Sequence, residues 1–153
     1  MSTPADVLNA LMAQLQASDE LDYIEDSQIF LGARESITVF PTICIEREKM
    51  DEEEFVYPLA RLRMEVVLII CIKTHDKESQ LVGSGQDSDG ATVRGTLDVE
   101  NDVKLAIDAD RTLGGVAIHT KIMDSVDGII EMPVRSVNLR LEILFQQTRA
   151  VRS

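Results

Sequence analysis

Hydrophobic residues recur along the chain with a helical period in two regions. Over residues 5–17 the repeat predicts a helix, with the apolar stripe Val7, Leu8, Leu11, Met12 and Leu15. Thr3 followed by Pro4 is typical of a helix start, because Thr accepts a hydrogen bond from a backbone N–H and Pro suits the first helical position. A second helix is predicted over residues 96–108, where acidic side chains suit the positive end of the helix dipole.

Alternating hydrophobic positions predict strands elsewhere in the chain. The predicted strands cover residues 23–30, 37–45, 62–72, 116–123 and 132–147. Pro41 cannot donate to a ladder, so its strand is expected at an edge or bulged there. The second half of 62–72 is apolar on both faces, which favours a central strand covered on both sides by a helix, a loop or a neighbouring subunit. Asp127-Gly128 predicts the turn of a hairpin between the last two strands.

Two segments are predicted to be flexible loops. Residues 46–57 carry a dense run of like charges that repel one another, and residues 75–93 contain the turn-rich stretch 83–90. The order of the elements predicts one α+β domain over residues 1–153, with a mainly antiparallel mixed sheet of about five strands and two helices packed on one face. Because two helices cannot cover both faces, the other face is expected to meet water or another copy.

Composition narrows the classes of function. The net charge is −12, and residues 1–60 hold 13 acids against 3 bases. This acidity, with only 4% aromatic residues, argues against a non-specific nucleic-acid binder. No apolar stretch of membrane-spanning length and no signal peptide are apparent, and two cysteines are too few for a disulfide scaffold. A soluble protein of a reducing compartment is therefore the default expectation.

The sequence offers no recognisable catalytic, cofactor or metal site. His75 and His119 lack a nucleophile motif beside them, and we expect both at strand ends or on the surface. Cys44 and Cys71 lie within predicted strands, as small buried hydrophobic residues do, and no further zinc ligands are spaced near them. The stretch 87–90 does not fit the register of an EF-hand, and neither a phosphate-binding loop nor a dinucleotide fingerprint occurs.

The order of elements and several short phrases resemble one family. The chain carries, in order, a helix at 7–15, the phrase Pro41-Thr-Ile-Cys-Ile45, an apolar strand at 62–72, a helix at 97–107, the step Leu113-Gly-Gly115 and an alternating strand at 134–145. Over about residues 4–148 this layout resembles the tail-terminator (minor tail) proteins of long-tailed bacteriophages, including their P-x-I-x-V phrase and L-x-G step.

The resemblance implies a structural protein without enzyme activity. It implies a homo-oligomeric ring, six-membered in the family, that caps the tail tube and joins it to the head-closure complex. The expected partners are the tail-tube protein and a head-closure or connector protein, and DNA would pass through the ring without specific binding. The protein would lie in the tail or neck of the virion after assembly in the host cytoplasm, without contact with a membrane.

Eight charged residues are candidates for the interface or the lumen of such a ring. They are Asp51, Glu52, Glu53, Glu54, Arg61, Arg63, Arg135 and Arg140. The acidic run 51–54 could line the channel, where it would repel phosphates, or meet a polar partner. The arginines could pair with acids of a neighbouring copy, or they could be ordinary solvent-facing strand residues.

Two other interpretations stay open. A head-closure or neck adaptor protein of the same particle has a similar architecture. A small non-phage enzyme or ligand-binding α+β domain could use paired carboxylates in an acidic pocket, although the densest acids form one run. The missing motifs, together with strands that carry more apolar surface than two short helices can cover, favour assembly as the function.

Overall fold

The structure, a computed structural model, describes residues 2–32, 39–73, 83, 85–86, 92–131 and 133–149. Its elements are α1 (Pro4–Ala17), the 3₁₀ turns η1 (Asp19–Leu21) and η2 (Asp26–Gln28), β1 (Ile29–Leu31), β2 (Thr42–Val56), β3 (Leu59–Lys73), β4 (Gly85–Gln86), β5 (Thr92–Val93), α3 (Thr96–Asp108), β6 (His119–Glu131) and β7 (Val134–Thr148).

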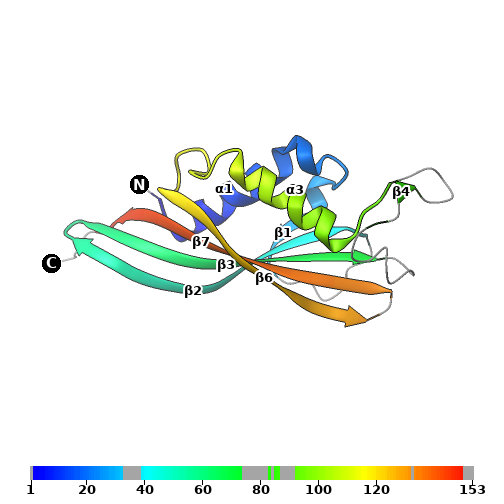
Figure 1. Cartoon of the computed structure of the whole chain (residues 1–153). Helices are drawn as coiled ribbons and strands as arrows, with labels where there is room; N and C mark the ends of the chain where they lie inside the picture. The colour runs from blue at the N-terminus through cyan, green and yellow to red at the C-terminus, as the bar shows by residue number, and fades with distance from the viewer. Residues whose placement is uncertain are drawn as a thin grey trace.

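Five of the strands form one twisted sheet, in the order β1-β2-β3-β7-β6. β1 pairs with β2 in parallel, and the other neighbours are antiparallel. Both α-helices lie on the same face of this sheet, and β4 and β5 form a separate two-stranded ribbon (Figure 1). The predicted α+β fold, with a mainly antiparallel sheet and helices on one side, is therefore confirmed.

Both predicted helices are confirmed, and α1 begins at the expected cap. The backbone N–H of Asp6 donates to Thr3 Oγ1 at 3.2 Å, and the N–H of Thr3 donates to the Asp6 carboxylate at 3.0 Å. Hydrogen bonds from the backbone and the side chain of Thr3 to the carboxylate lower the pKa of Asp6. Gln14 then ties α1 to the end of α3, because its Nε2 donates to the carbonyls of Ala106 and Asp110, each at 2.9 Å. Within the described ranges no helix is long and apolar enough to cross a bilayer.

The hydrophobic core lies between the helices and the sheet. Val7, Leu11 and Leu15 of α1 are fully buried there, as are alternate residues of the two central strands. Those strand residues are Met64, Val66, Leu68 and Ile70 of β3 and Leu139, Leu141, Ile143 and Phe145 of β7. The central position predicted for 62–72 is confirmed, because β3 lies between β2 and β7.

The face of the sheet that points away from the helices, the open face, is less apolar than the sequence suggested. Val67 and Cys71 point to this face, yet they are only 9% and 8% exposed in the single chain. A second copy is therefore not needed to bury them. Nearer the β2–β3 turn, the open face carries charged side chains such as Arg61, Arg63 and Glu65.

The predicted loop at 46–57 is wrong. Residues 46–56 continue β2 and pair with β3 as far as Val56 opposite Leu59. Backbone hydrogen bonds to β3 hold this segment as a strand, while most of its charged side chains stay exposed. Register shifts between Arg47 and Lys49 and between Glu52 and Glu54 accommodate the irregular alternation of its side chains. Repulsion among the acids of this segment is offset by basic side chains on neighbouring strands. The order of residues along the chain does not show which strands become neighbours.

Three strand predictions need correction. Residues 23–28 contain the turn η2 instead of a strand, and only Ile29–Leu31 pair, as β1. The predicted strand 37–45 begins at Thr42, directly after Pro41, so this proline precedes the ladder; residues 37–38 lie outside the described residues. Asp127-Gly128 is not a turn, because β6 runs on to Glu131 and absorbs the irregularity as a register shift. Most of the predicted loop 75–93 lies outside the described residues.

Candidate interaction surfaces

Arg63 stands at the centre of the ion pairs on the open face. It projects from β3, between β2 and β7. Its Nε lies 3.1 Å from Glu142 Oε1 of β7, and its Nη2 pairs with Glu53 of β2. One guanidinium therefore joins three strands.

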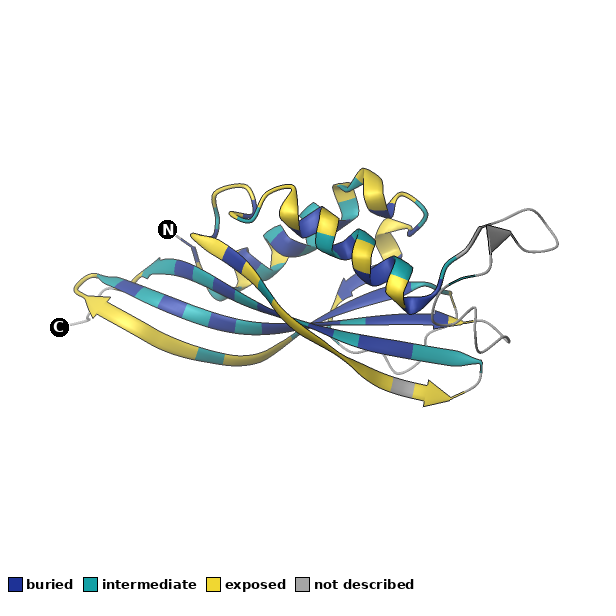
Figure 2. Ribbon diagram, in the orientation of Figure 1, coloured by how far each residue is buried: buried dark blue, intermediate teal, exposed yellow. Residues whose placement is uncertain are grey.

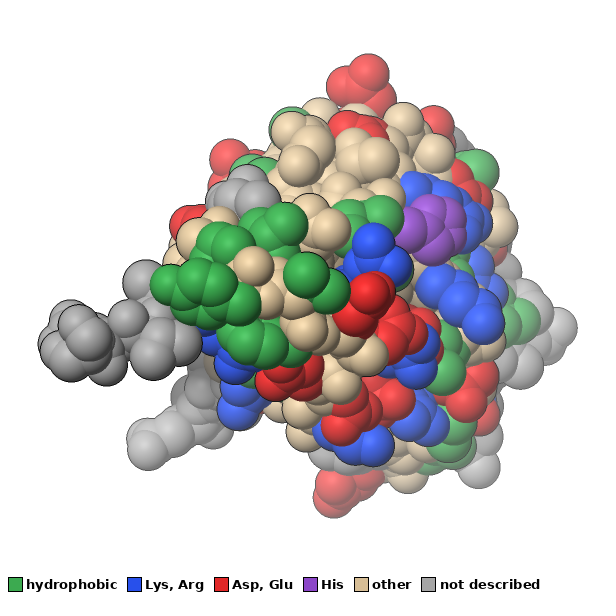
Figure 3. Space-filling model, turned by 90° about the vertical axis from the view of Figure 1, so that its left-hand side faces the viewer, with side chains coloured by type: hydrophobic (Ala, Val, Ile, Leu, Met, Phe, Trp, Pro, Cys, Tyr) green, Lys and Arg blue, Asp and Glu red, His purple; other side chains and the backbone are tan. Residues whose placement is uncertain are grey.

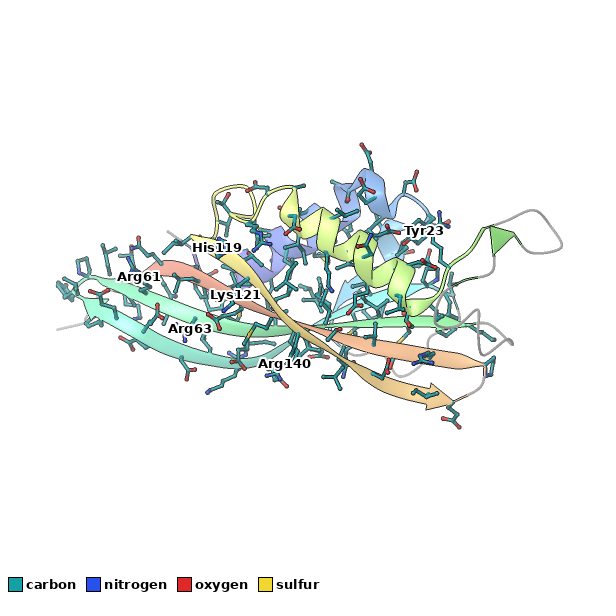
Figure 4. All side chains as sticks on the ribbon, viewed as in Figure 1. Tyr23, Arg61, Arg63, His119, Lys121 and Arg140 are labelled. Carbon is teal, nitrogen blue, oxygen red and sulfur yellow. The ribbon has the colours of Figure 1, made fainter. Side chains whose placement is uncertain are left out.

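Arg140 makes a second, wider group on β7. Its guanidinium lies 3.6 Å from Glu48 of β2, 3.8 Å from Glu65 of β3 and 3.7 Å from Asp124 of β6. Figure 4 shows Arg61, Arg63, Arg140 and Lys121 along adjacent strands of the sheet. The side chains of Arg61, Arg63 and Arg140, with the acids that pair with them, form an ionic array across four strands. Those acids are Glu48, Glu53 and Glu54 of β2, Glu65 of β3, Asp124 of β6 and Glu142 of β7.

The structure brings most of the predicted charged candidates to this array or to its border. Arg61 pairs with Glu54 at 3.7 Å, Asp51 with Lys49 at 3.3 Å, and Glu52 with Arg149 at 2.6 Å. Arg135 is the exception, because it pairs with Asp127 at 3.3 Å in the β6–β7 hairpin. Every predicted arginine thus has an acid of its own chain beside it.

Four acids of the array were missed by sequence reasoning: Glu48, Glu65, Asp124 and Glu142. Strand alternation does place Glu65 on the face of Arg63, and Glu142 on the face of Arg140. Only the register of β3 against β7, however, sets Arg63 beside Leu144 and Glu142, and Arg140 beside Val67 and Glu65. The predicted pairing of the arginines with another copy stays a prediction.

The two edges of the sheet distribute their charges differently. β2 is paired with β1 only at residues 43–45, so from Glu46 onward its outer edge has no strand beside it in the described chain. This stretch is acidic. At the other edge, β6 begins with His119 and Lys121, and Arg111 donates to the carbonyl of Thr120 at 3.4 Å. Its later residues include Asp124, Asp127 and Glu131, so only the start of this edge is basic. Figure 2 shows that the hairpin half of β2 and the far half of β6 are exposed, with buried strands between them.

The β2–β3 turn exposes large hydrophobic side chains. Phe55, Val56 and Tyr57 are 45%, 62% and 60% exposed. Hydrophobic side chains gather at this end of the molecule, beside charged ones (Figure 3). The Arg149 guanidinium lies 4.9 Å from the centre of the Phe55 ring. The backbone N–H of Arg149 donates to the Pro58 carbonyl at 2.8 Å. The end of β7 thereby braces this turn.

A polar cluster that was not predicted from the sequence joins residues 19–28, called the 3₁₀ segment, to α3. The Tyr23 hydroxyl donates to Asp102 Oδ2 at 2.7 Å, and the Arg94 guanidinium lies 3.7 Å from the centre of the tyrosine ring. Burial raises the pKa of Tyr23, and the hydrogen bond to Asp102 raises it further. The cluster is a structural brace, because its polar groups already bind one another.

The residues considered for chemistry do not form a catalytic centre among the described residues. His119 is exposed at the start of β6, while His75 and residues 87–90 lie outside the described residues. Cys44 and Cys71 are buried free thiols, and burial raises the pKa of Cys71. In the described part of the chain, no group of three or more His, Cys, Asp or Glu side chains could hold a metal ion.

Comparison with known proteins gives a likeness of fold. No family model matches the chain, and no curated protein matches it in sequence. Among solved structures, a chain from the virion of a native gene transfer agent particle superposes with a TM-score of 0.53 at 9% sequence identity. The match covers 92% of this chain and 95% of that one, so the two share a fold over nearly their whole lengths.

Proposed function

We propose that this chain is a structural protein of a phage-like virion, and that its copies form the ring that terminates the tail tube. The observation that carries the proposal is the shared fold with a chain of a gene transfer agent virion, which leaves almost no part of either chain unmatched. The layout of the sequence, which resembles tail-terminator proteins, supports the finer assignment. We propose no catalytic role.

The unlike edges of the sheet support a ring. A contact between the acidic stretch of β2 and the start of β6, where Lys121 lies, joins two different surfaces and is heterologous, and such contacts generate closed rings when the rotation between copies closes. The acidic stretch of β2 in one copy would face Arg111, His119 and Lys121 in the next. Arg135, at the other end of the β6–β7 hairpin, is a second candidate for this contact.

The two faces and the exposed turn would then have separate roles. The helices would lie outside, and the open face, with the acidic run 51–54 at its border, would line the channel through which DNA passes. The apolar turn at Phe55, Val56 and Tyr57 would contact the tail tube or the head-closure protein. Apolar side chains at a projecting end suit such a contact, because their burial drives association.

The mass of the assembled protein tests the ring. Native mass spectrometry and light scattering should give six times the 17.0 kDa of one chain, with a central channel in electron micrographs. Lys121→Glu should weaken assembly, because it reverses charge at the edge. Lys104→Glu, the same change on α3, is the matched control and should assemble normally.

A wild-type protein that stays monomeric at all concentrations would refute the ring. Imaging of labelled virions tests the position of the ring. Density at the end of the tail tube supports a terminator, whereas density among the head-closure proteins would replace that assignment by a neck adaptor.

A further inference from the structure

The helical side of the molecule has a hollow between the end of α1 and the end of α3. Its volume is about 390 Å³. Leu105, which is 45% exposed, contributes to its apolar lining together with three alanines. The alanines are Ala17, Ala106 and Ala109. Because the distance between packed helices depends on the side chains at their contact, these small residues let another segment approach both helices closely.

The border of this hollow is acidic. Asp19 and Glu20 of η1 and Asp110, which follows α3, line it, and none of the described residues that line it is basic. Neither helix has a basic residue in its last turn, so the negative ends of two helix dipoles lie here without a cation of their own. Arg111 is the next base along the chain, and Asp108 holds its guanidinium at 2.6 Å. The hollow is therefore negative as well as apolar.

Gln14 shows that one wall of the hollow is rich in hydrogen-bond acceptors. Its Nε2 donates to the carbonyls of Ala106 and Asp110 at 2.9 Å each and to that of Ile107 at 3.4 Å. Three carbonyl oxygens at the end of α3 thus converge on one neutral amide. Because this amide carries no charge, it satisfies the carbonyls without neutralising the acids of the border.

We propose that the hollow docks a basic amphipathic helix of another virion protein. The apolar side chains of that helix would pack against Leu105 and the alanines, as an amphipathic helix does in an apolar groove. Its lysines or arginines would lie beside Asp19 and Glu20. Charge complementarity favours this occupant, because opposite charges speed the encounter and like charges exclude acidic segments. The choice of a virion protein rests on the proposed function, in which the helices lie outside the ring and leave the hollow accessible.

Charge variants test the acidic border. The probe is a labelled amphipathic peptide of about 14 leucine and lysine residues at helical spacing. Its binding is measured by fluorescence anisotropy at low salt. The variant Asp19→Asn/Glu20→Gln should bind about fivefold more weakly than the control Asp22→Asn/Asp26→Asn, since each exposed ion pair contributes little. Both variants have a net charge of −10 instead of −12, and all four residues are exposed in the 3₁₀ segment.

Steric variants test the hollow itself. Ala109→Trp fills it and should weaken binding of the peptide at least about tenfold, because the indole takes the place of the apolar face of the helix. Ala13→Trp is the matched control, since Ala13 is exposed on α1 and does not line the hollow. Circular dichroism verifies folding, and Ala17→Trp, at another exposed lining residue, replaces Ala109→Trp if that variant does not fold.

Three results would overturn the inference. Equal binding by the two charge variants would show a general attraction to an acidic protein. Undiminished binding by Ala109→Trp would place the peptide elsewhere. Self-association of the wild type that Ala109→Trp abolishes would assign the hollow to a second copy of the chain. Failure of the ring is seen separately, because a monomer that binds the peptide in this hollow would refute the ring and leave the docking site in place.

Discussion

The hydroxyl of Tyr23 offers a test of the brace between the 3₁₀ segment and α3. Tyr23→Phe removes the 2.7 Å hydrogen bond to Asp102 but keeps the ring beneath Arg94. A hydrogen bond to a charged group contributes about 1.5–3 kcal/mol, and for this half-buried pair we expect the lower end, about 1.5 kcal/mol. In a chain of this size that corresponds to a fall in Tm of about 3–6 °C.

The raised pKa of Tyr23 makes the difference in stability between wild type and Tyr23→Phe depend on pH. In the unfolded chain Tyr23 ionises near pH 10, whereas in the folded chain its raised pKa keeps it protonated. The stabilisation is therefore fully present below about pH 10 and is lost as pH rises further, by about 1.4 kcal/mol per pH unit. The gap between wild type and Tyr23→Phe should be about 1.5 kcal/mol at pH 8 and close to zero at pH 11.

Urea unfolding at the two pH values measures the gap. A second readout uses Tyr57→Phe, which leaves Tyr23 as the only tyrosine of the chain. The tyrosinate absorbance of that variant should not rise near pH 10 while the protein stays folded. An equal gap at pH 8 and pH 11, or ionisation of Tyr23 near pH 10 in the folded protein, would refute the reasoning.

Three further predictions concern stability. Phe145→Ala should lower the free energy of unfolding by about 3–5 kcal/mol, since the ring is fully buried, whereas Phe55→Ala at the exposed turn should change the urea midpoint little. Thr3→Ala should cost about 1 kcal/mol by removing the cap of α1, measured by thermal unfolding. Hydrogen bonds from the Thr112 side chain and from the Gly114 and Thr112 backbone lower the pKa of Asp110, so its stabilising effect is present above the unfolded pKa and is lost as pH falls. Wild-type stability should therefore fall more steeply than that of Asp110→Asn between about pH 5 and pH 3, and parallel curves would contradict this.

The helices and the central strand could be predicted from the sequence because their signals are local. The stripe on α1 and its Thr3 cap involve residues within a few positions of one another, and the burial of β3 follows from its own apolar run. The missed 3₁₀ turns at 19–28 have only short, weak signals, since each contains three helical residues. Asp127-Gly128 is a typical turn pair, yet continued pairing with β7 overrides that preference.

The ionic array depends on strand register, which composition does not contain. Taken along the chain, residues 51–54 are four like charges in a row, and repulsion predicts a loop. In the folded protein Arg61 and Arg63 arrive from β3 and Arg149 from the end of β7, so the same run becomes part of a strand.

The sequence by itself determined the α+β class, both helices, the central strand and the excess of acid. The tertiary structure decided which acid lies beside which arginine, which edges of the sheet remain open and which hydrophobic residues project at the β2–β3 turn. The physical reason is the distance along the chain over which each kind of interaction acts. Helix periodicity and capping act within a few residues, whereas Glu48, Glu65 and Asp124 meet Arg140 only when four strands have paired in one register.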